Sequence, residues 1–493
     1  MTDQYYEDRL SKLSRLAALG HDPYGRRFEG VRANGEVRHH AERLGLEPGQ
    51  IDDSAVVRVA GRIVLRREMG KLTFLAIRDS TGDMQIGISK SRVGEAGWAA
   101  AECFDLGDII GIDGPLGRTK TNEITVWARS TTMLGKSLRP PPEKWHGLQD
   151  VDLRYRERYV DLFANPEVMQ VFKARSRVID AVRDYFRGEG FLEVETPMLQ
   201  PIYGGAAARP FVTHHNSLDL DLYLRISPEL YLKRLLVGGM ERVFEINRNF
   251  RNEGISTLHN PEFTMMECYQ AYADLTDMMR HVEGLTSKCI EVMGGGFKRR
   301  FKQIELEFAP PWPRRTYIEL LRQHAGLDLK DSAAVADKAR AHNIATKTAD
   351  GADLDPAIVA NRLFEATVEP HLVQPQFVTE YPAALCPLTR RKEDDPALAL
   401  RFEAFAAGME LGNAYTELND PAVQRQTLSA QVKGEGDETM RVMDADFLRA
   451  LEYGMPPAGG LGVGMDRLVM LLTNSASIRD VILFPLQRPH GKD

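Results

Sequence analysis

The spacing of hydrophobic positions changes near residue 56. Residues 5–19 place apolar side chains three or four positions apart, with Arg and Lys between them, and so predict an amphipathic helix. Beyond residue 56, short runs alternate apolar and polar positions, as β-strands do, and glycines separate the runs. The runs are residues 57–64, 72–77, 84–88, 109–112 and 124–127. Strands of this number and length predict a small closed barrel.

A proline-rich segment separates this region from a second one. Arg139 precedes three consecutive prolines, which can form neither a helix nor a central strand, so we expect a stiff linker over 139–150. Beyond it the pattern predicts a helix over 171–188 and a strand over 191–196 that stops at Pro197. The later strands and helices show no regular βαβ alternation, which favours an α+β domain on an antiparallel sheet. The expected organisation is a helical extension (1–50), a barrel (51–138), the linker and an α+β domain (151–493).

Composition is that of an ordinary globular protein. Of 493 residues, 43% are hydrophobic and 27% are charged, and the length allows several domains. The formal net charge of −7 argues against a protein that coats nucleic acid non-specifically, but it is compatible with a local basic face. The N-terminus lacks signal-peptide character, no apolar run is long enough to span a membrane, and the four cysteines lack zinc-type spacing. We expect a cytoplasmic protein that does not enter a membrane.

Residues 244–269 carry the densest group of chemically capable side chains. Strand parity predicts that Arg251 and Glu253 share one face of a first strand. Alternate positions of a second strand would share a face as well, namely Phe263, Met265, Glu267 and Tyr269. An arginine, glutamates and aromatic rings on one side suit a zwitterion and a nucleotide better than a hydrophobic core. The competing interpretation is a hairpin with a solvated polar face.

Residues 408–420 carry a second group. Asn413, Tyr415 and Glu417 share strand parity, and a bulge at Gly412 would bring Glu410 to the same face. Two carboxylates there would suit Mg²⁺ together with phosphate oxygens, although two solvated glutamates would give the same pattern.

A glycine-rich third stretch covers residues 459–472. Its glycines do not have the spacing of a dinucleotide-binding loop, and we expect them to allow close backbone approach on a strand. Arg467 then projects from the start of an apolar helix, where a structural role is the competing interpretation.

Together these stretches resemble the signature motifs of class II aminoacyl-tRNA synthetases. Motif 1 corresponds to about 171–197, motif 2 to about 244–269 with FRNE at 250–253, and motif 3 to about 459–472 with GMDR at 464–467. Within the class, the chain is most similar to the bacterial lysyl-tRNA synthetases, through residues 204–211, 227–233, 260–267 and 417–420. The resemblance implies an N-terminal OB-fold that binds the anticodon and a catalytic domain whose antiparallel sheet is flanked by helices.

The resemblance implies an enzyme that activates L-lysine with ATP, releases pyrophosphate, and transfers lysine from the adenylate to the 3′ end of tRNA(Lys). It also implies Mg²⁺, about two or three ions per site with phosphate oxygens among their ligands, and a homodimer formed through motif 1. The lysine carboxylate itself attacks the α-phosphorus, so the site works by alignment and charge stabilisation. The absence of a nucleophile motif agrees with this chemistry.

The resemblance gives five residues roles toward ATP. Arg251 is expected to hold the α-phosphate and the lysine carboxylate, and Arg467 to hold the γ-phosphate and cover one face of the adenine. Phe263 is expected to stack on the other face. Glu253 and His259 are expected to contact the adenine and the γ-phosphate end, respectively. Arg251 and Arg467 are the expected catalytic residues.

The lysine pocket and the metal site follow from the same resemblance. Glu410 and Glu417 are expected to bind Mg²⁺. The α-amino group is expected beside Gly205 and Glu229, and the ε-ammonium beside Glu417 and Tyr269. The complete expected lysine pocket is Gly205, Glu229, Arg251, Glu267, Tyr269, Asn413, Tyr415 and Glu417.

In the barrel, the resemblance implies that Phe74 stacks on an anticodon base and that Gln85 and Glu123 read base edges. Several cations near Phe74 suit the phosphates of a single-stranded loop, namely Arg62, Arg66, Arg67, Lys71 and Arg78. The competing interpretation places Phe74 in the barrel core.

Three positions depart from the family pattern. Met409 stands where arginine is common, Ala414 where glycine is common, and Tyr415 where phenylalanine is common. Tyr415 keeps an aromatic wall, whereas Ala414 is expected to narrow the pocket slightly and raise the Michaelis constant for lysine.

Three alternatives remain. An aspartyl- or asparaginyl-type synthetase is disfavoured because its substrate would need other partners than Glu417 and Tyr269. A paralogue that attaches lysine to a protein would lack the N-terminal barrel. A non-catalytic tRNA-binding factor would not be expected to keep the motif residues together.

Overall fold

The computed structural model describes residues 2–142, 148–206, 208–348, 351–432 and 443–489. The chain divides into two compact units, one of Met1–Arg154 with Tyr159–Asn165, the other of Tyr155–Arg158 with Pro166–Asp493. Part of the expected linker, residues 143–147, lies outside the described residues. All four cysteines are buried and free. Within the described ranges, no helix is long and apolar enough to cross a membrane.

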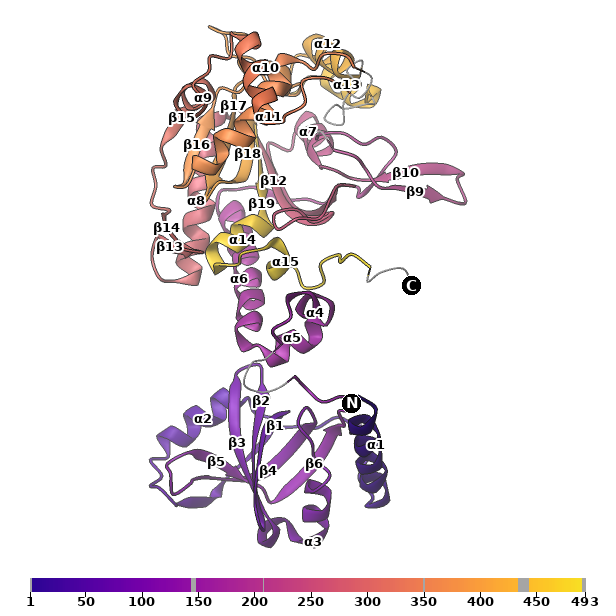
Figure 1. The fold of residues 1–493 in the computed structure, drawn as a ribbon, viewed down its shortest axis with the longest axis vertical. Coiled ribbons are helices and arrows are strands. Elements are labelled where there is room, and N and C mark those ends of the chain that lie inside the picture. Colours follow the sequence, from indigo (N-terminus) through magenta and orange to yellow (C-terminus); the bar gives the residue numbers. More distant parts are fainter. Residues whose placement is uncertain (1, 143–147, 207, 349–350, 433–442, 490–493) are drawn as a thin grey trace. The chain divides into compact units, whose positions relative to one another are not determined.

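The first unit is built on a closed β-barrel (Figure 1). Its strands follow the order β1–β2–β3–β5–β4, a pairing of β4 with β1 closes the ring, and β6 pairs with β4 outside it. The strands are β1 (Ile51–Met69), β2 (Leu72–Asp79), β3 (Gly82–Ser89), β4 (Ile109–Arg118), β5 (Ile124–Trp127) and β6 (Ser130–Gly135). Val59, Ile77 and Ile112 are fully buried inside, as the alternating pattern requires. The predicted barrel is confirmed, and β6 is a strand that the pattern did not predict.

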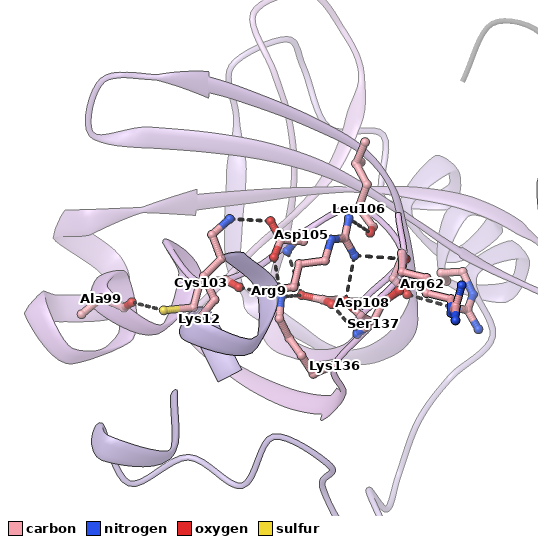
Figure 2. A network of polar contacts seen from close by, with 12 residues as sticks. Arg9, Lys12, Arg62, Ala99, Cys103, Asp105, Leu106, Asp108, Lys136 and Ser137 are labelled. Carbon is pink, nitrogen blue, oxygen red and sulfur yellow. Dashed lines mark hydrogen bonds and ion pairs between the residues drawn. The ribbon is translucent and has the colours of Figure 1, made fainter. Parts of the chain in front are cut away.

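Helices α1 (Thr2–Ala18), α2 (Asn34–Arg43) and α3 (Lys90–Ala101) accompany the barrel, and α1 confirms the predicted N-terminal helix. A polar network ties α1 to the barrel (Figure 2). Arg9 donates to the backbone carbonyls of residues 106 and 137 at 3.0 and 2.8 Å. Lys12 pairs with Asp105 at 2.5 Å, and the fully buried Lys136 pairs with Asp105 at 2.6 Å and Asp108 at 2.9 Å. Because a buried charge is tolerated only when it is paired, this network fixes α1 in place.

The second unit is built on an eight-stranded sheet in the order β15–β16–β17–β18–β19–β12–β11–β7 (Figure 1). Its central pairings are antiparallel, and only the outermost pairings, β15 with β16 and β7 with β11, are parallel. The strands are β7 (Leu192–Glu193), β11 (Arg242–Phe250), β12 (Glu262–Ala271), β15 (Arg314–Thr316), β16 (Gln376–Thr379), β17 (Arg401–Ala406), β18 (Met409–Thr416) and β19 (Ala458–Gly464). The predicted α+β class is confirmed.

Helices cover this sheet. The largest hydrophobic core joins one of its faces to α6 (Pro166–Gly188), α8 (Leu275–Met293) and α14 (Met465–Thr473). The helix predicted over 171–188 is thus part of α6, and its predicted apolar positions Val178, Val182 and Phe186 are fully buried. Further helices of this unit are α7 (Glu229–Val237), α9 (Tyr317–Ala325), α10 (Ser332–Ala341), α11 (Pro356–Thr367), α12 (Pro421–Val432), α13 (Ala445–Glu452) and α15 (Ile478–Val481), whereas most residues of α4 (Val151–Arg156) and α5 (Arg158–Ala164) belong to the first unit. Short strands outside the large sheet are β8 (Leu199–Gln200), β9 (Val212–His215), β10 (Leu220–Leu224), β13 (Lys298–Phe301) and β14 (Ile304–Glu307).

Two local predictions are wrong. β11 ends at Phe250, so Arg251 and Glu253 lie in the following loop and do not share a strand face. The backbone N–H of Arg251 donates to the carbonyl of Pro261 at 2.9 Å, outside the β11–β12 ladder. The strand predicted over 191–196 shortens to β7, because only its first residues find a partner strand in β11.

Candidate active site

A cavity of about 1130 Å³ lies within the second unit, lined in part by residues of β12, β18 and β19. Small-molecule sites typically measure roughly 300–1,000 Å³, so this one has room for a nucleotide and an amino acid together. All but one of the residues predicted for ATP, lysine or metal line it, namely Gly205, Glu229, Arg251, Glu253, His259, Phe263, Glu267, Tyr269, Glu410, Asn413, Tyr415 and Arg467. The exception is Glu417.

Glycines of β19 make the floor of the cavity possible. Gly460 lies directly between Tyr269 of β12 and Tyr415 of β18 in the strand register. A Cβ on Gly460 would lie 2.0 Å from Oε1 of Glu417 and 2.5 Å from Cε1 of Tyr269, so no larger residue fits. The prediction that these glycines allow close backbone approach on a strand is confirmed.

Asp466 joins the three motif regions. Its Oδ2 accepts a hydrogen bond from the backbone N–H of Thr264 in β12 at 2.8 Å, and its Oδ1 accepts one from Nη1 of Arg175 in α6 at 2.6 Å. Asp466 is almost fully buried and stands one residue before Arg467 in the first turn of α14. The position of Arg467 is therefore fixed by strands and helices far from it in sequence.

Arg467 contacts two other predicted residues. Its Nη1 donates to the backbone carbonyl of Glu410 at 2.8 Å, and its Nη2 lies 3.2 Å from Nε2 of His259. A guanidinium only donates, so Nε2 must accept and the ring proton lies on Nδ1, 2.9 Å from Oγ of Ser256. Burial, together with the nearby Arg467, lowers the pKa of His259, which keeps the ring neutral at neutral pH.

Arg251 is positioned to take an anion. Its guanidinium carbon lies 5.1 Å from the centre of the Phe263 ring, and its Nε is buried without a hydrogen-bond partner among the described residues. A buried donor without a partner costs free energy until a ligand supplies an acceptor. With Arg467, it gives the cavity two fixed cations.

A pair of carboxylates lies on neighbouring strands. The register of β17 against β18 shifts so that Ala404 faces Gly412 and Phe405 faces Glu410, which leaves Leu411 as the extra residue of the predicted bulge. Glu410 and Glu403, a residue of β17 that the sequence did not single out, both line the cavity. Burial raises the pKa of Glu403; Arg401 opposes this shift, whereas Glu410 adds to it. The strand pairing that brings these carboxylates together cannot be read from either strand alone.

These carboxylates fit a divalent cation only in part. Across the described portions of the chain, no group of three or more His, Cys, Asp or Glu residues is arranged to hold a metal ion. Mg²⁺ usually binds through one or two carboxylates plus phosphate oxygens and water. The cavity therefore offers two carboxylate ligands for Mg²⁺, from Glu403 and Glu410, and a nucleotide would supply phosphate oxygens as further ligands.

A buried cluster of carboxyl groups around one lysine adjoins the cavity, and Glu229 and Glu267 of this cluster line it. Lys233, which is fully buried, pairs with Oε1 of Glu229 at 2.7 Å and with Oε2 of Glu417 at 2.5 Å. Burial raises the pKa of Glu417, and the ion pair with Lys233 opposes this shift. Burial, and after it the Glu229 carboxylate, likewise raises the pKa of Glu267 to about 8.

Lys233 is a residue that the sequence reasoning missed. It stands four positions after Glu229 on α7, so helical spacing was a signal for this pair. Nothing local indicated its contact with Glu417, because the latter follows β18, far along the chain. Oε1 of Glu417 lies where a side chain on Gly460 would project, although Glu417 is not among the residues that line the cavity.

The positions that depart from the family pattern fall on different sides of β18. Tyr415 lines the cavity, whereas Met409 and Ala414 are buried in the hydrophobic core. The expectation that Ala414 narrows the pocket is wrong, because its parity turns its side chain away from the cavity.

In the barrel, Phe74 is partly exposed between the buried residues Thr73 and Leu75, so it lies on the outer wall and not in the core. Nε2 of Gln85 donates to Oγ1 of Thr125 at 2.8 Å. Glu123 is exposed, with its carboxylate 3.5 Å from the guanidinium of Arg38.

Comparisons with known proteins agree with this geometry. Residues 150–488 match the family of class II tRNA synthetases (D, K and N), and residues 57–134 match an OB-fold nucleic acid binding domain. The chain is 54% identical to the lysine–tRNA ligase of Pelotomaculum thermopropionicum, over 98% of this chain and 94% of that protein. It is 50% identical to that of Moorella thermoacetica and 48% identical to one of Dehalococcoides mccartyi, over 98% of this chain and 97% and 98% of theirs. The chain therefore belongs to the class II tRNA synthetases, and within them to the lysine–tRNA ligase family.

Proposed function

We propose that this cavity joins L-lysine to ATP, forms lysyl-adenylate and pyrophosphate, and then transfers lysine to the 3′ end of tRNA(Lys). The observation that carries the proposal is a single cavity lined both by the guanidinium groups of Arg251 and Arg467 and by the carboxyl groups of Glu229 and Glu267. The guanidinium groups suit phosphates and a carboxylate, and the carboxyl groups suit ammonium groups.

The reaction needs alignment more than a reactive protein group. The lysine carboxylate attacks the α-phosphorus, the bond to the pyrophosphate oxygen breaks, and no proton has to move in this step. Arg251 holds the attacking carboxylate and the α-phosphate together, which stabilises the charge on the reacting phosphate. Phe263 supports the guanidinium through its ring and offers the adenine a stacking surface. Arg467 binds the γ-phosphate, and the neutral His259 orients it.

Magnesium fits the same cavity. Glu403 is buried and pairs with Arg401, and Glu410 is partly exposed; the two carboxyl groups repel each other, and a divalent cation would relieve this repulsion. When bound with the nucleotide, Mg²⁺ would neutralise charge on the phosphates. We assign this role to Glu403 and Glu410, and Glu417 to the amino acid instead.

Selection of lysine rests on the carboxyl cluster. Oε2 of Glu417 lies 2.5 Å from Nζ of Lys233, whereas Oε1 has no hydrogen-bond partner in the described parts of the chain. The other oxygen, Oε1, lies beside Tyr269 and Gly460, where a substrate ε-ammonium would satisfy it. A neutral side chain of similar length would leave this buried acceptor unpaired, which disfavours its selection.

Assembly and location are part of the proposal. Apolar side chains are exposed around motif 1 and on the β9–β10 hairpin, namely Leu192, Met198, Leu199, Val212, Leu218 and Leu220. Exposed apolar patches of this kind mark protein interfaces, so we expect these surfaces to meet in a homodimer. Four buried, unpaired cysteines agree with a reducing compartment such as the cytoplasm.

The test is exchange of labelled pyrophosphate into ATP, measured with each of the twenty amino acids in the absence of tRNA. Exchange should depend on lysine and on Mg²⁺. Strong exchange with aspartate or asparagine and none with lysine would overturn the assigned specificity. Sedimentation of the protein at micromolar concentration checks the dimer separately.

A further inference from the structure

The indole ring of Trp127 lies flat on the outer wall of the barrel. Trp127 ends β5, which runs between β3 and β4. A Cβ on Gly87 of β3 would lie 2.7 Å from Cε3 of the indole, and a Cβ on Gly117 of β4 would lie 2.9 Å from its Nε1. The ring therefore spans both flanking strands, and it can do so only because each of them has a glycine beneath it.

One face of this ring is covered by the barrel and the ring is nevertheless partly exposed, so its accessible surface is on the outer side. Its Nε1 is buried without a partner among the described residues. Trp127 therefore offers a ligand an aromatic face and not a hydrogen-bond donor. Such a face suits a nucleobase, because every base has a π-surface to stack on it.

Phe74 lies beside this ring. The two ring centres are 5.9 Å apart and the planes meet at 68°, so the rings contact edge to face and do not stack on each other. Phe74 faces Gly87 across the β2–β3 pairing, which puts the two aromatic rings on neighbouring positions of the same wall. Each ring can then support a different base.

The surroundings favour single-stranded RNA as the occupant. Arg67 is exposed and stands directly opposite Phe74 in β1, and Lys71 is exposed at the adjoining turn. Cations beside aromatic rings are the combination that binds phosphates and bases of an unpaired strand. Gln85 shares the wall, two residues before Gly87, and offers an amide to a base edge.

We propose that Trp127 forms a second nucleobase-stacking subsite of the barrel, next to Phe74, which takes another base of the same single-stranded RNA loop. The proposal rests on the proposed function of the barrel in binding the tRNA anticodon. Stacking of a base on an aromatic side chain contributes enough that its loss should weaken RNA binding about 5- to 100-fold.

The experiment uses the full chain and tRNA(Lys) anticodon stem-loops that carry 2-aminopurine at one loop position at a time. Stacking on an aromatic ring quenches this base. Trp127→Leu should raise the dissociation constant and abolish quenching at one position, and Phe74→Leu should do the same at a different position. Trp98→Leu is the matched control, because Trp98 belongs to the same unit but lies on α3 and donates to Glu102 at 3.0 Å.

Circular dichroism checks that each variant is folded. Crosslinking tests the subsite in the unaltered protein and does not depend on how the variants fold. An RNA with 5-iodouridine at the affected loop position should crosslink to Trp127. Parent affinity and parent quenching in Trp127→Leu, with a loss only in Phe74→Leu, would overturn the subsite and leave the role of the barrel intact. Parent affinity in both variants would instead overturn the proposed anticodon-binding function.

Discussion

The substitution Lys233→Met tests the charge balance of the lysine pocket. Methionine keeps much of the length of the side chain and removes its charge. In the parent, Lys233 is fully buried and holds Glu229 at 2.7 Å and Glu417 at 2.5 Å. The variant leaves both carboxyl groups buried without their shared cation.

The magnitude follows from the burial of all three groups. Breaking a buried ion pair by removing one partner costs about 3–5 kcal/mol. Uptake of a proton by Glu417 limits this cost, since burial favours its protonated form once Lys233 no longer opposes the rise in its pKa, so we expect a stability loss of about 3 kcal/mol, the lower end of that range. Lysine binding should suffer as well. A protonated Glu417 cannot make a charge-assisted hydrogen bond, worth roughly 1.5–3 kcal/mol, so affinity for lysine at pH 7 should fall about 10- to 100-fold.

The dependence on pH has a definite sign. Removal of Lys233 raises the pKa of Glu417 further, because Lys233 is the group that opposes the shift. Bound lysine favours the ionised carboxylate, so the variant must release a proton on binding, and its deficit should shrink as the pH rises from about 7 toward 9.

Calorimetry of lysine binding without ATP, at both pH values, measures these effects, and urea unfolding measures stability. Lys288→Met is the control, because the partly exposed Lys288 pairs with Glu291 at 3.1 Å on the surface of α8, where an ion pair contributes at most about 1 kcal/mol. A folded Lys233→Met protein that binds lysine at pH 7 as tightly as the parent would refute the reasoning. An affinity deficit that does not change with pH would refute the protonation argument.

The remaining predictions concern the same cavity and the barrel. The KM for lysine should fall as the pH rises through about 8. Burial, and after it Glu229, raises the pKa of Glu267 to about 8, and only the ionised carboxylate holds an ammonium group. If the KM of a Glu267→Gln enzyme still falls over this pH range, another group is responsible. Glu417→Gln should weaken lysine binding about 10- to 100-fold while the circular dichroism spectrum stays unchanged. Arg467→Ala should impair the use of ATP and leave lysine binding, measured by calorimetry, near the parent value. The reverse pattern would assign Glu417 to ATP and Arg467 to lysine. Glu403→Gln should raise the Mg²⁺ concentration that half-saturates pyrophosphate exchange, and an unchanged Mg²⁺ dependence would remove Glu403 from the metal site. A chain that begins at Val151 should still exchange pyrophosphate with lysine but charge tRNA poorly, and full charging efficiency would contradict the role given to the barrel.

The local sequence was sufficient to predict most helices and strands and most of the residues that line the cavity. Apolar spacing predicted the helix within α6 and the strands of the barrel, because burying one face of a regular element requires a fixed period. The parity of β12 correctly brought Phe263, Glu267 and Tyr269 to one side. The bulge near Gly412, which brings Glu410 to the cavity, was also predictable from the sequence. Glu410 differs in strand parity from Asn413 and Tyr415, and a glycine between them allows a bulge.

The tertiary structure decided what each carboxylate does. Glu403 reaches the cavity beside Glu410 because β17 pairs with β18, and Glu417 meets Lys233 because α7 packs near the end of β18. Parity alone also misjudged Arg251 and Glu253, since β11 ends at Phe250 and both residues lie in the following loop. A residue's own neighbours in sequence set its backbone preference and its face. Its protonation, its ion-pair partner and its distance from a substrate depend on which distant segments exclude water from it, and that is fixed only when strands and helices far apart in the chain pack together.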